Sequence, residues 1–112
     1  MSYKIKSRIW IETADGVFLG EGRIDLLKAI QREGSLSKAA AQLGMSYKKA
    51  WNLLDSINRS AKKPVAVTTT GGKGGGGATI TSYGIKMITA FETINKGCWD
   101  FLDAEMKKID WS

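Results

Sequence analysis

The residues best suited to chemistry in this 112-residue chain form a polar, basic run at positions 46–52. Hydroxyl, ammonium and amide groups gather there, on Ser46, Tyr47, Lys48, Lys49 and Asn52. Such groups can hydrogen-bond to base edges and to phosphates of nucleic acid. The run therefore predicts binding to a polyanion rather than catalysis.

The composition gives little support to catalysis or metal binding. The chain has no histidine and a single cysteine, Cys98. A disulfide within the chain, a Cys/His zinc site and a histidine general base are therefore excluded. No nucleophile stands at motif spacing from a base either. We expect a protein that is not an enzyme and that has no metal and no cofactor.

A glycine-rich run at residues 72–77 is the second feature that could do chemistry. It fits G-x-G-x-x-G, but a dinucleotide site requires a helix directly after the loop, and a β-prone segment follows here. A phosphate-binding loop would need Ser or Thr after Lys73, where glycine stands. Bare backbone around one lysine suits close approach to DNA, so Lys73, Gly74 and Gly75 are candidate contacts. A flexible loop is the alternative.

Positive charge is concentrated in the middle of the chain. The whole chain has 17 lysines and arginines against 11 acids, a net charge of +6. Residues 34–91 hold eight of the basic residues and one acid, Asp55, a net charge of +7. Such a concentration suggests nucleic acid as the partner. A solvated basic surface explains it equally well, so the charge alone leaves both interpretations open.

Three predicted helices occupy residues 23–61 and must position the polar run. The first carries an apolar stripe and ends at a glycine. Ser37 can cap a short second helix over residues 38–43, and Ser46 can cap a third helix over residues 47–59.

The second and third helices are predicted to form a helix-turn-helix. Alanines allow the second helix to approach closely, and Gly44 permits a left-handed turn. In that motif the first turn of the second helix of the pair enters the major groove. Two amphipathic helices joined by glycine also occur in helical bundles. The basic, capped start of the third helix favours recognition of DNA.

The candidate DNA contacts offer hydroxyl, amide, ammonium or backbone N–H groups. They are Ser37, Ser46, Tyr47, Lys48, Lys49, Asn52, Lys62, Lys63, Lys73, Gly74 and Gly75.

β-Hairpins are predicted on both sides of these helices. Residues 3–20 alternate apolar and polar side chains around a turn at 14–16, and are expected to pack on the helices or on a partner subunit. Residues 65–81 follow the pattern strand, glycine loop, strand. A hairpin directly after a helix-turn-helix is a wing.

A long helix is predicted over residues 82–109, with apolar residues at three- and four-residue steps. It is too long for so small a domain to cover, so its apolar stripe is expected to meet a second copy in a homodimer. The predicted interface residues are Ile88, Phe91, Ile94, Cys98, Phe101 and Leu102, with Cys98 a buried structural thiol.

The length predicts one α+β domain over residues 1–112, a winged helix-turn-helix with an amino-terminal hairpin and a long carboxy-terminal helix. No apolar leader and no run of 18 apolar residues is found. We expect a cytoplasmic protein that does not associate with membranes.

Residues 34–51 and the glycine-rich segment that ends in Ile80-Thr81-Ser82-Tyr83-Gly84 resemble the winged helix-turn-helix of the ModE family. Members of that family are bacterial molybdate-responsive transcriptional regulators. The resemblance covers roughly residues 23–95. The helix-turn-helix half is also similar to LysR-type regulators, and the wing decides between them.

The resemblance implies DNA binding as a dimer, with Tyr47, Lys48 and Lys49 in the recognition helix and Lys73 in the wing. Molybdate-sensing members carry oxyanion-binding domains after the long helix, whereas this sequence ends at Ser112. The resemblance therefore supports DNA binding more strongly than oxyanion sensing.

The sequence thus favours a sequence-specific, homodimeric, DNA-binding transcriptional regulator. Lys73→Ala is expected to weaken binding to all sequences alike, whereas changes at Tyr47 or Lys48 should alter the preferred sequence. The alternative is a protein–protein adaptor on the same scaffold, which the long apolar helix and Trp10 could serve. Lys48 and Lys49 argue against it.

Overall fold

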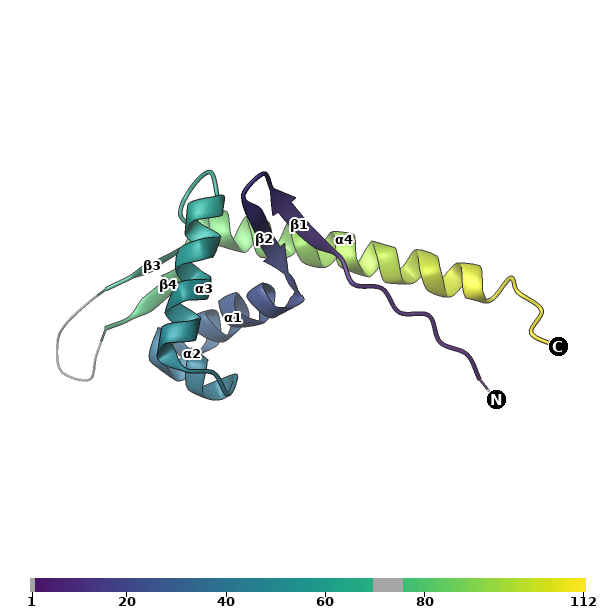
Figure 1. The fold of residues 1–112 in the computed structure, drawn as a ribbon, viewed down its shortest axis with the longest axis horizontal. Coiled ribbons are helices and arrows are strands. Elements are labelled where there is room, and N and C mark those ends of the chain that lie inside the picture. The colour runs from purple at the N-terminus through teal and green to yellow at the C-terminus, as the bar shows by residue number, and fades with distance from the viewer. Residues whose placement is uncertain (1, 70–75) are drawn as a thin grey trace.

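The computed structural model describes residues 2–69 and 76–112, which form four helices and two small antiparallel sheets (Figure 1). In chain order the elements are β1 (Trp10–Thr13), β2 (Gly16–Gly20), α1 (Glu21–Glu33), α2 (Leu36–Gln42), α3 (Tyr47–Ser60), β3 (Ala66–Thr68), β4 (Ala78–Ile80) and α4 (Ser82–Met106). The α+β winged-helix prediction is confirmed. No helix in the described part of the chain is long and apolar enough to cross a bilayer.

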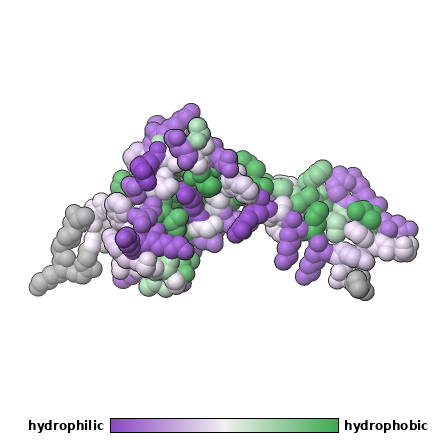
Figure 2. Space-filling view, in the orientation of Figure 1, coloured by the Kyte–Doolittle hydropathy of each residue, from purple (hydrophilic) through white to green (hydrophobic). Residues whose placement is uncertain are grey.

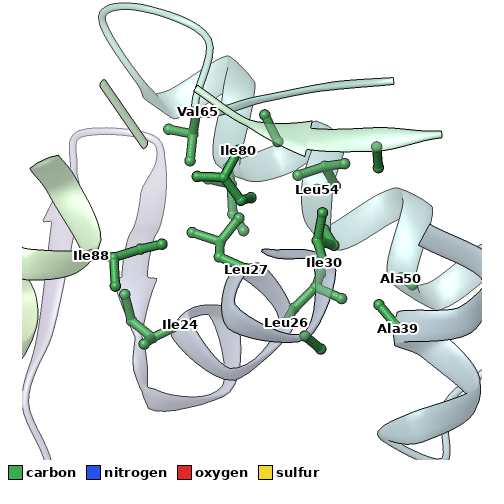
Figure 3. Close-up of a cluster of buried hydrophobic side chains, with 14 of the residues drawn as sticks. Ile24, Leu26, Leu27, Ile30, Ala39, Ala50, Leu54, Val65, Ile80 and Ile88 are labelled. Atoms are coloured by element: carbon green, nitrogen blue, oxygen red, sulfur yellow. The ribbon is translucent and has the colours of Figure 1, made fainter. Parts of the chain in front are cut away.

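The core is built around α1, whose apolar stripe is completely covered. Leu26, Leu27 and Ile30 have no exposed surface. The base of the second sheet lies over Leu27 with Val65 and Ile80, as Figure 3 shows. Burial of side chains of this size contributes roughly 1.5–3 kcal/mol each, so α1 is the main support for the elements around it.

The amino-terminal hairpin is shorter than the predicted 3–20. Antiparallel pairing joins only Trp10–Thr13 to Gly16–Gly20, and residues 2–9 have no strand partner. A bulge shifts the register after Ile11. It lets two consecutive residues of β2, Phe18 and Leu19, both enter the core, which strict alternation would forbid.

Residues 3–9 instead run as an extended strap beside the distal half of α4. The Tyr3 and Trp111 rings stack with centroids 4.5 Å apart, and Ser7 Oγ lies 3.5 Å from Cys98 Sγ. The helix itself ends at Met106, before the predicted residue 109. Because α4 projects from the body, the molecule measures 63 × 30 × 23 Å (Figure 1).

The start of α4 is held tightly against the chain segment that leads into β3. Thr81 caps the helix by accepting a hydrogen bond from Gly84 N at 2.9 Å, as predicted. Its own N–H donates to Val65 O at 3.0 Å. A Cβ at position 84 would lie only 2.2 Å from that same carbonyl oxygen, so only glycine fits there.

Candidate nucleic-acid interface

The turn between α2 and α3 has the predicted geometry. Gly44 adopts a left-handed conformation with φ of 67°, which side chains disfavour. Ala39 and Ala50 are fully buried where α2 meets α3, and Figure 3 shows them side by side. Small side chains thus allow the two helices to approach closely.

Ser46 begins α3 as its cap. Its Oγ accepts a hydrogen bond from Lys49 N at 3.1 Å, and its carbonyl accepts one from Ala50 N at 3.0 Å. The first turn therefore leaves the body with Tyr47 and Lys48 exposed, Tyr47 by 56%. A capped, outward-facing turn of this kind suits groove reading.

Ser37 does not cap α2, contrary to the prediction. The cap is Ser35, whose Oγ accepts from Lys38 N at 3.2 Å, and the helix begins at Leu36. Leu36 is almost completely buried, so including it in the helix brings one more apolar residue to the core. Ser37 is exposed in the first turn of α2.

The electrostatics of this surface favour an anion. Neither α2 nor α3 has an acid in its first turn. Arg59, farther along α3, pairs with Asp55 at 3.0 Å, whereas Lys48 and Lys49 join none of the ion pairs among the described residues. Figure 2 shows a largely hydrophilic surface over this face. In the described part of the chain, no neighbouring carboxylate therefore competes with a partner for these two lysines.

An open groove of about 400 Å³ runs beside α3 on the side of the first hairpin. Lys49, Asn52 and Ser56 line it from the helix, and Arg23 lines it from α1. The Arg23 guanidinium donates to Val17 O at 2.8 Å and to Ser56 Oγ at 3.1 Å. Partial burial lowers the pKa of Arg23, but a guanidinium stays charged at any physiological pH. Sequence reasoning missed Arg23, because its partner Ser56 is 33 residues away.

Asn58 connects α3 to the base of the wing. Its Oδ1 accepts hydrogen bonds from Val65 N at 2.8 Å and Ala66 N at 3.3 Å, and its Nδ2 donates to Ala66 O at 3.0 Å. One amide side chain thus satisfies three backbone groups where β3 begins. Sequence reasoning did not single out Asn58 either, because a helix asparagine gives no local signal of this contact.

The second sheet pairs as a wing should. Its register joins Ala66 to Ile80 and Thr68 to Ala78, and Ala78 N donates to Gly34 O at 3.0 Å. The last contact fixes the sheet to the junction of α1 and α2.

The remaining predicted DNA contacts are not all brought together. Lys73, Gly74 and Gly75 lie outside the described residues. Lys62 and Lys63 are exposed beyond the carboxyl end of α3, roughly 20 Å along the axis from its first turn. They therefore belong to a different part of the surface from Lys48 and Lys49.

The six residues predicted for a dimer interface have different environments. Ile88 and Phe91 are buried in the core of their own chain, so they are already covered. Cys98 and Leu102 are half-buried on the part of α4 that residues 3–9 accompany. Ile94 and Phe101 are exposed by 57% and 62%. Only this last pair presents an open apolar surface.

Metal-binding potential is low in residues 2–69 and 76–112. They contain no group of three or more His, Cys, Asp or Glu side chains close enough to hold an ion.

Sequence comparison gives relatives that are named ModE, MopA or MopB. The chain is 39% identical over 104 residues to the molybdenum transport protein ModE of Azotobacter vinelandii, covering 93% of this chain and 38% of that protein. It is 40% identical over 95 residues to the molybdenum-pterin-binding protein MopB of Rhodobacter capsulatus, covering 85% and 35%. It is 40% identical over 78 residues to the DNA-binding transcriptional dual regulator ModE of Escherichia coli K12, covering 70% and 30%.

No family model matches the chain. The chain spans between 30% and 38% of the length of these three curated relatives. It is therefore a homologue of the ModE family over a region equal to about a third of the length of those proteins.

Proposed function

We propose that the chain is a sequence-specific DNA-binding transcriptional regulator that acts as a homodimer in the cytoplasm and has no catalytic activity. The observation that carries the proposal is the Ser46-capped first turn of α3, which contains no acid and projects Tyr47 and Lys48 from the surface. The names of the relatives, which include a DNA-binding transcriptional regulator, agree with it.

In this proposal the first turn of α3 enters the major groove. Tyr47, Lys48, Lys49 and Asn52 reach base edges and nearby phosphates, and Ser37 and Ser46 donate to phosphates. The second sheet lies along the backbone, with Lys73, Gly74 and Gly75 as proposed contacts. Lys62 and Lys63 give flanking phosphate contacts that carry no sequence preference.

The distal half of α4 supports the dimer. Ile94 and Phe101 are seven residues apart, which places them two turns apart on one face of the helix. Figure 2 shows hydrophobic side chains on the projecting part of the molecule. Two copies joined along this face would present two α3 helices to half-sites about 34 Å apart.

The first test is selection of purified protein on pooled genomic fragments at two salt concentrations, with sequencing of the retained fragments. A regulator of the proposed kind enriches a palindromic site that survives the higher salt. If all binding were lost at the higher salt and no site were enriched, the binding would be explained by charge alone, without sequence recognition. Absence of binding at both salts would favour the adaptor.

The second test uses two matched double variants to distinguish contacts with base edges from contacts with phosphates. Lys48→Ala with Lys49→Ala removes two charges at the first turn, and Lys62→Ala with Lys63→Ala removes two at the far end of α3. The first pair should lose the enriched site, because base contacts give roughly 1–3 kcal/mol of discrimination each. The second pair should weaken binding to every sequence alike. Equal, sequence-independent losses from both pairs would refute the assignment.

A further inference from the structure

We propose that a trough between α3 and the first hairpin binds a phosphate of the DNA backbone, so that the β1–β2 hairpin acts as a second wing. The inference rests on the proposed function and extends it to a surface that the helix-turn-helix motif does not include.

The trough consists of two adjoining hollows along one side of α3. The groove of about 400 Å³ continues into a second hollow of about 310 Å³, and both are lined by Arg23, Lys49 and Leu53. Trp10 lines the second hollow from β1, and Arg8 lines it from the end of the strap, just before β1. The first turn of α3 and the hairpin therefore share one continuous depression.

The charge of this depression suits a phosphate. Four cationic side chains line it, Arg8, Arg23, Lys48 and Lys49, against one carboxylate, Glu21. None of the four cations joins an ion pair among the described residues. The lining therefore carries a net charge of +3, and neighbouring acids do not neutralise its cations.

Arg23 is held in place for such a contact. Its Nη1 donates to Val17 O at 2.8 Å, to Phe18 O at 3.5 Å and to Ser56 Oγ at 3.1 Å. Within the described residues, the other N–H groups of the guanidinium donate to no protein acceptor. A fixed guanidinium with N–H groups to spare recognises phosphate with little loss of side-chain entropy.

The position of the trough matches the geometry of a bound duplex. Figure 1 shows the β1–β2 hairpin and the β3–β4 wing on opposite sides of α3. A helix in the major groove lies between two sugar-phosphate backbones, because the groove is about 12 Å wide. When the β3–β4 wing follows one backbone, the trough faces the other.

The test uses the full chain and a duplex of about 30 base pairs that carries the enriched site. Arg8→Ala is the main variant, because Arg8 is exposed and no hydrogen bond of the described structure involves its side chain. Arg8→Lys retains the charge. Lys6→Ala is the matched control, since it removes one charge two residues away, from a side chain that lines a different hollow beside α4. Affinity is measured by fluorescence anisotropy over a series of salt concentrations.

We expect Arg8→Ala to weaken binding roughly three- to tenfold on all sequences and to reduce the salt slope by about 0.9, the value for one phosphate contact. Arg8→Lys and Lys6→Ala should stay within about twofold of the parent chain. A single methylphosphonate in the flanking backbone should weaken binding of the parent chain, and this effect should vanish with Arg8→Ala.

Equal behaviour of Arg8→Ala and Lys6→Ala, with the parent chain still binding its site, would overturn the second wing and leave the proposed function intact. Failure of the parent chain to bind the duplex would refute both the proposed function and the second wing. Saturable micromolar binding of inorganic pyrophosphate without DNA would assign the trough to a free phosphate compound and overturn the backbone assignment.

Discussion

Gly84→Ala tests the tightest glycine site among the described residues, where α4 begins against the segment that leads into β3. Alanine favours a helix over glycine by about 1 kcal/mol, so propensity alone predicts stabilisation. The structure predicts the opposite, because the added Cβ would lie 2.2 Å from Val65 O. A comfortable C···O contact is about 3.3 Å, so helix and carbonyl must separate by about 1 Å.

The magnitude follows from what that separation disturbs. Overpacking of a filled site costs about 1–3 kcal/mol. The same carbonyl accepts from Thr81 N at 3.0 Å, and a further 1 Å breaks this hydrogen bond at a cost of about 1 kcal/mol. After subtraction of the propensity gain, Gly84→Ala should destabilise the chain by roughly 1–3 kcal/mol. The melting temperature should fall by about 4 °C for each kcal/mol.

Gly97→Ala is the matched control in the same helix. A Cβ at Gly97 would meet nothing within 4 Å, so this change should stabilise the chain by about 0.5–1 kcal/mol. Both variants are compared with the parent chain by urea denaturation and calorimetry. If Gly84→Ala were as stable as Gly97→Ala, the tight contact at the start of α4 would be refuted.

Three further changes address the cap, the wing base and the dimer. Asn58→Ala should lower the free energy of unfolding by about 2–3 kcal/mol, because it removes the partners of three backbone groups. Hydrogen exchange at the first amides of β3 should become faster, and unchanged exchange would contradict this role. Ser46→Ala should cost about 1 kcal/mol in urea denaturation through loss of the cap, whereas Ser37→Ala, which removes no cap, should cost less than half as much. Phe101→Lys should shift sedimentation toward the monomer, while Thr89→Lys, on another face of α4, should not; equal sedimentation of the two would argue against the proposed interface.

Local rules explain which parts of the site could be predicted from sequence. Gly44 and Ser46 were identified correctly, since a left-handed turn and a helix cap depend on residue type and immediate neighbours. The same rules could not choose between Ser35 and Ser37, because both are good caps. Burial of Leu36 in the core decides for Ser35, and burial is a tertiary property.

Non-local contacts explain what the sequence could not predict. Apolar and polar residues do alternate over residues 3–11, but a strand also needs a partner strand. β2 is long enough to pair only with residues 10–13. Arg23 and Asn58 are missed because their hydrogen-bond partners lie on other elements. The long helix is predicted correctly from Ser82 to Met106 but not to residue 109. Ile88 and Phe91, which the sequence places in a dimer interface, are buried in the core of their own chain.

The strap has a consequence for the order in which the chain opens and closes. The contact between Ser7 and Cys98 joins two residues that are 91 positions apart in the sequence, whereas the helices form through contacts between residues close in sequence. Closing so long a loop is slow, and its contacts can stabilise the chain only after α4 has formed. The strap should therefore dock last in folding and be the first part to detach by local opening. Each detachment uncovers the side of Cys98 that Ser7 contacts, so the rate of thiol labelling at low denaturant would report this opening separately from global unfolding.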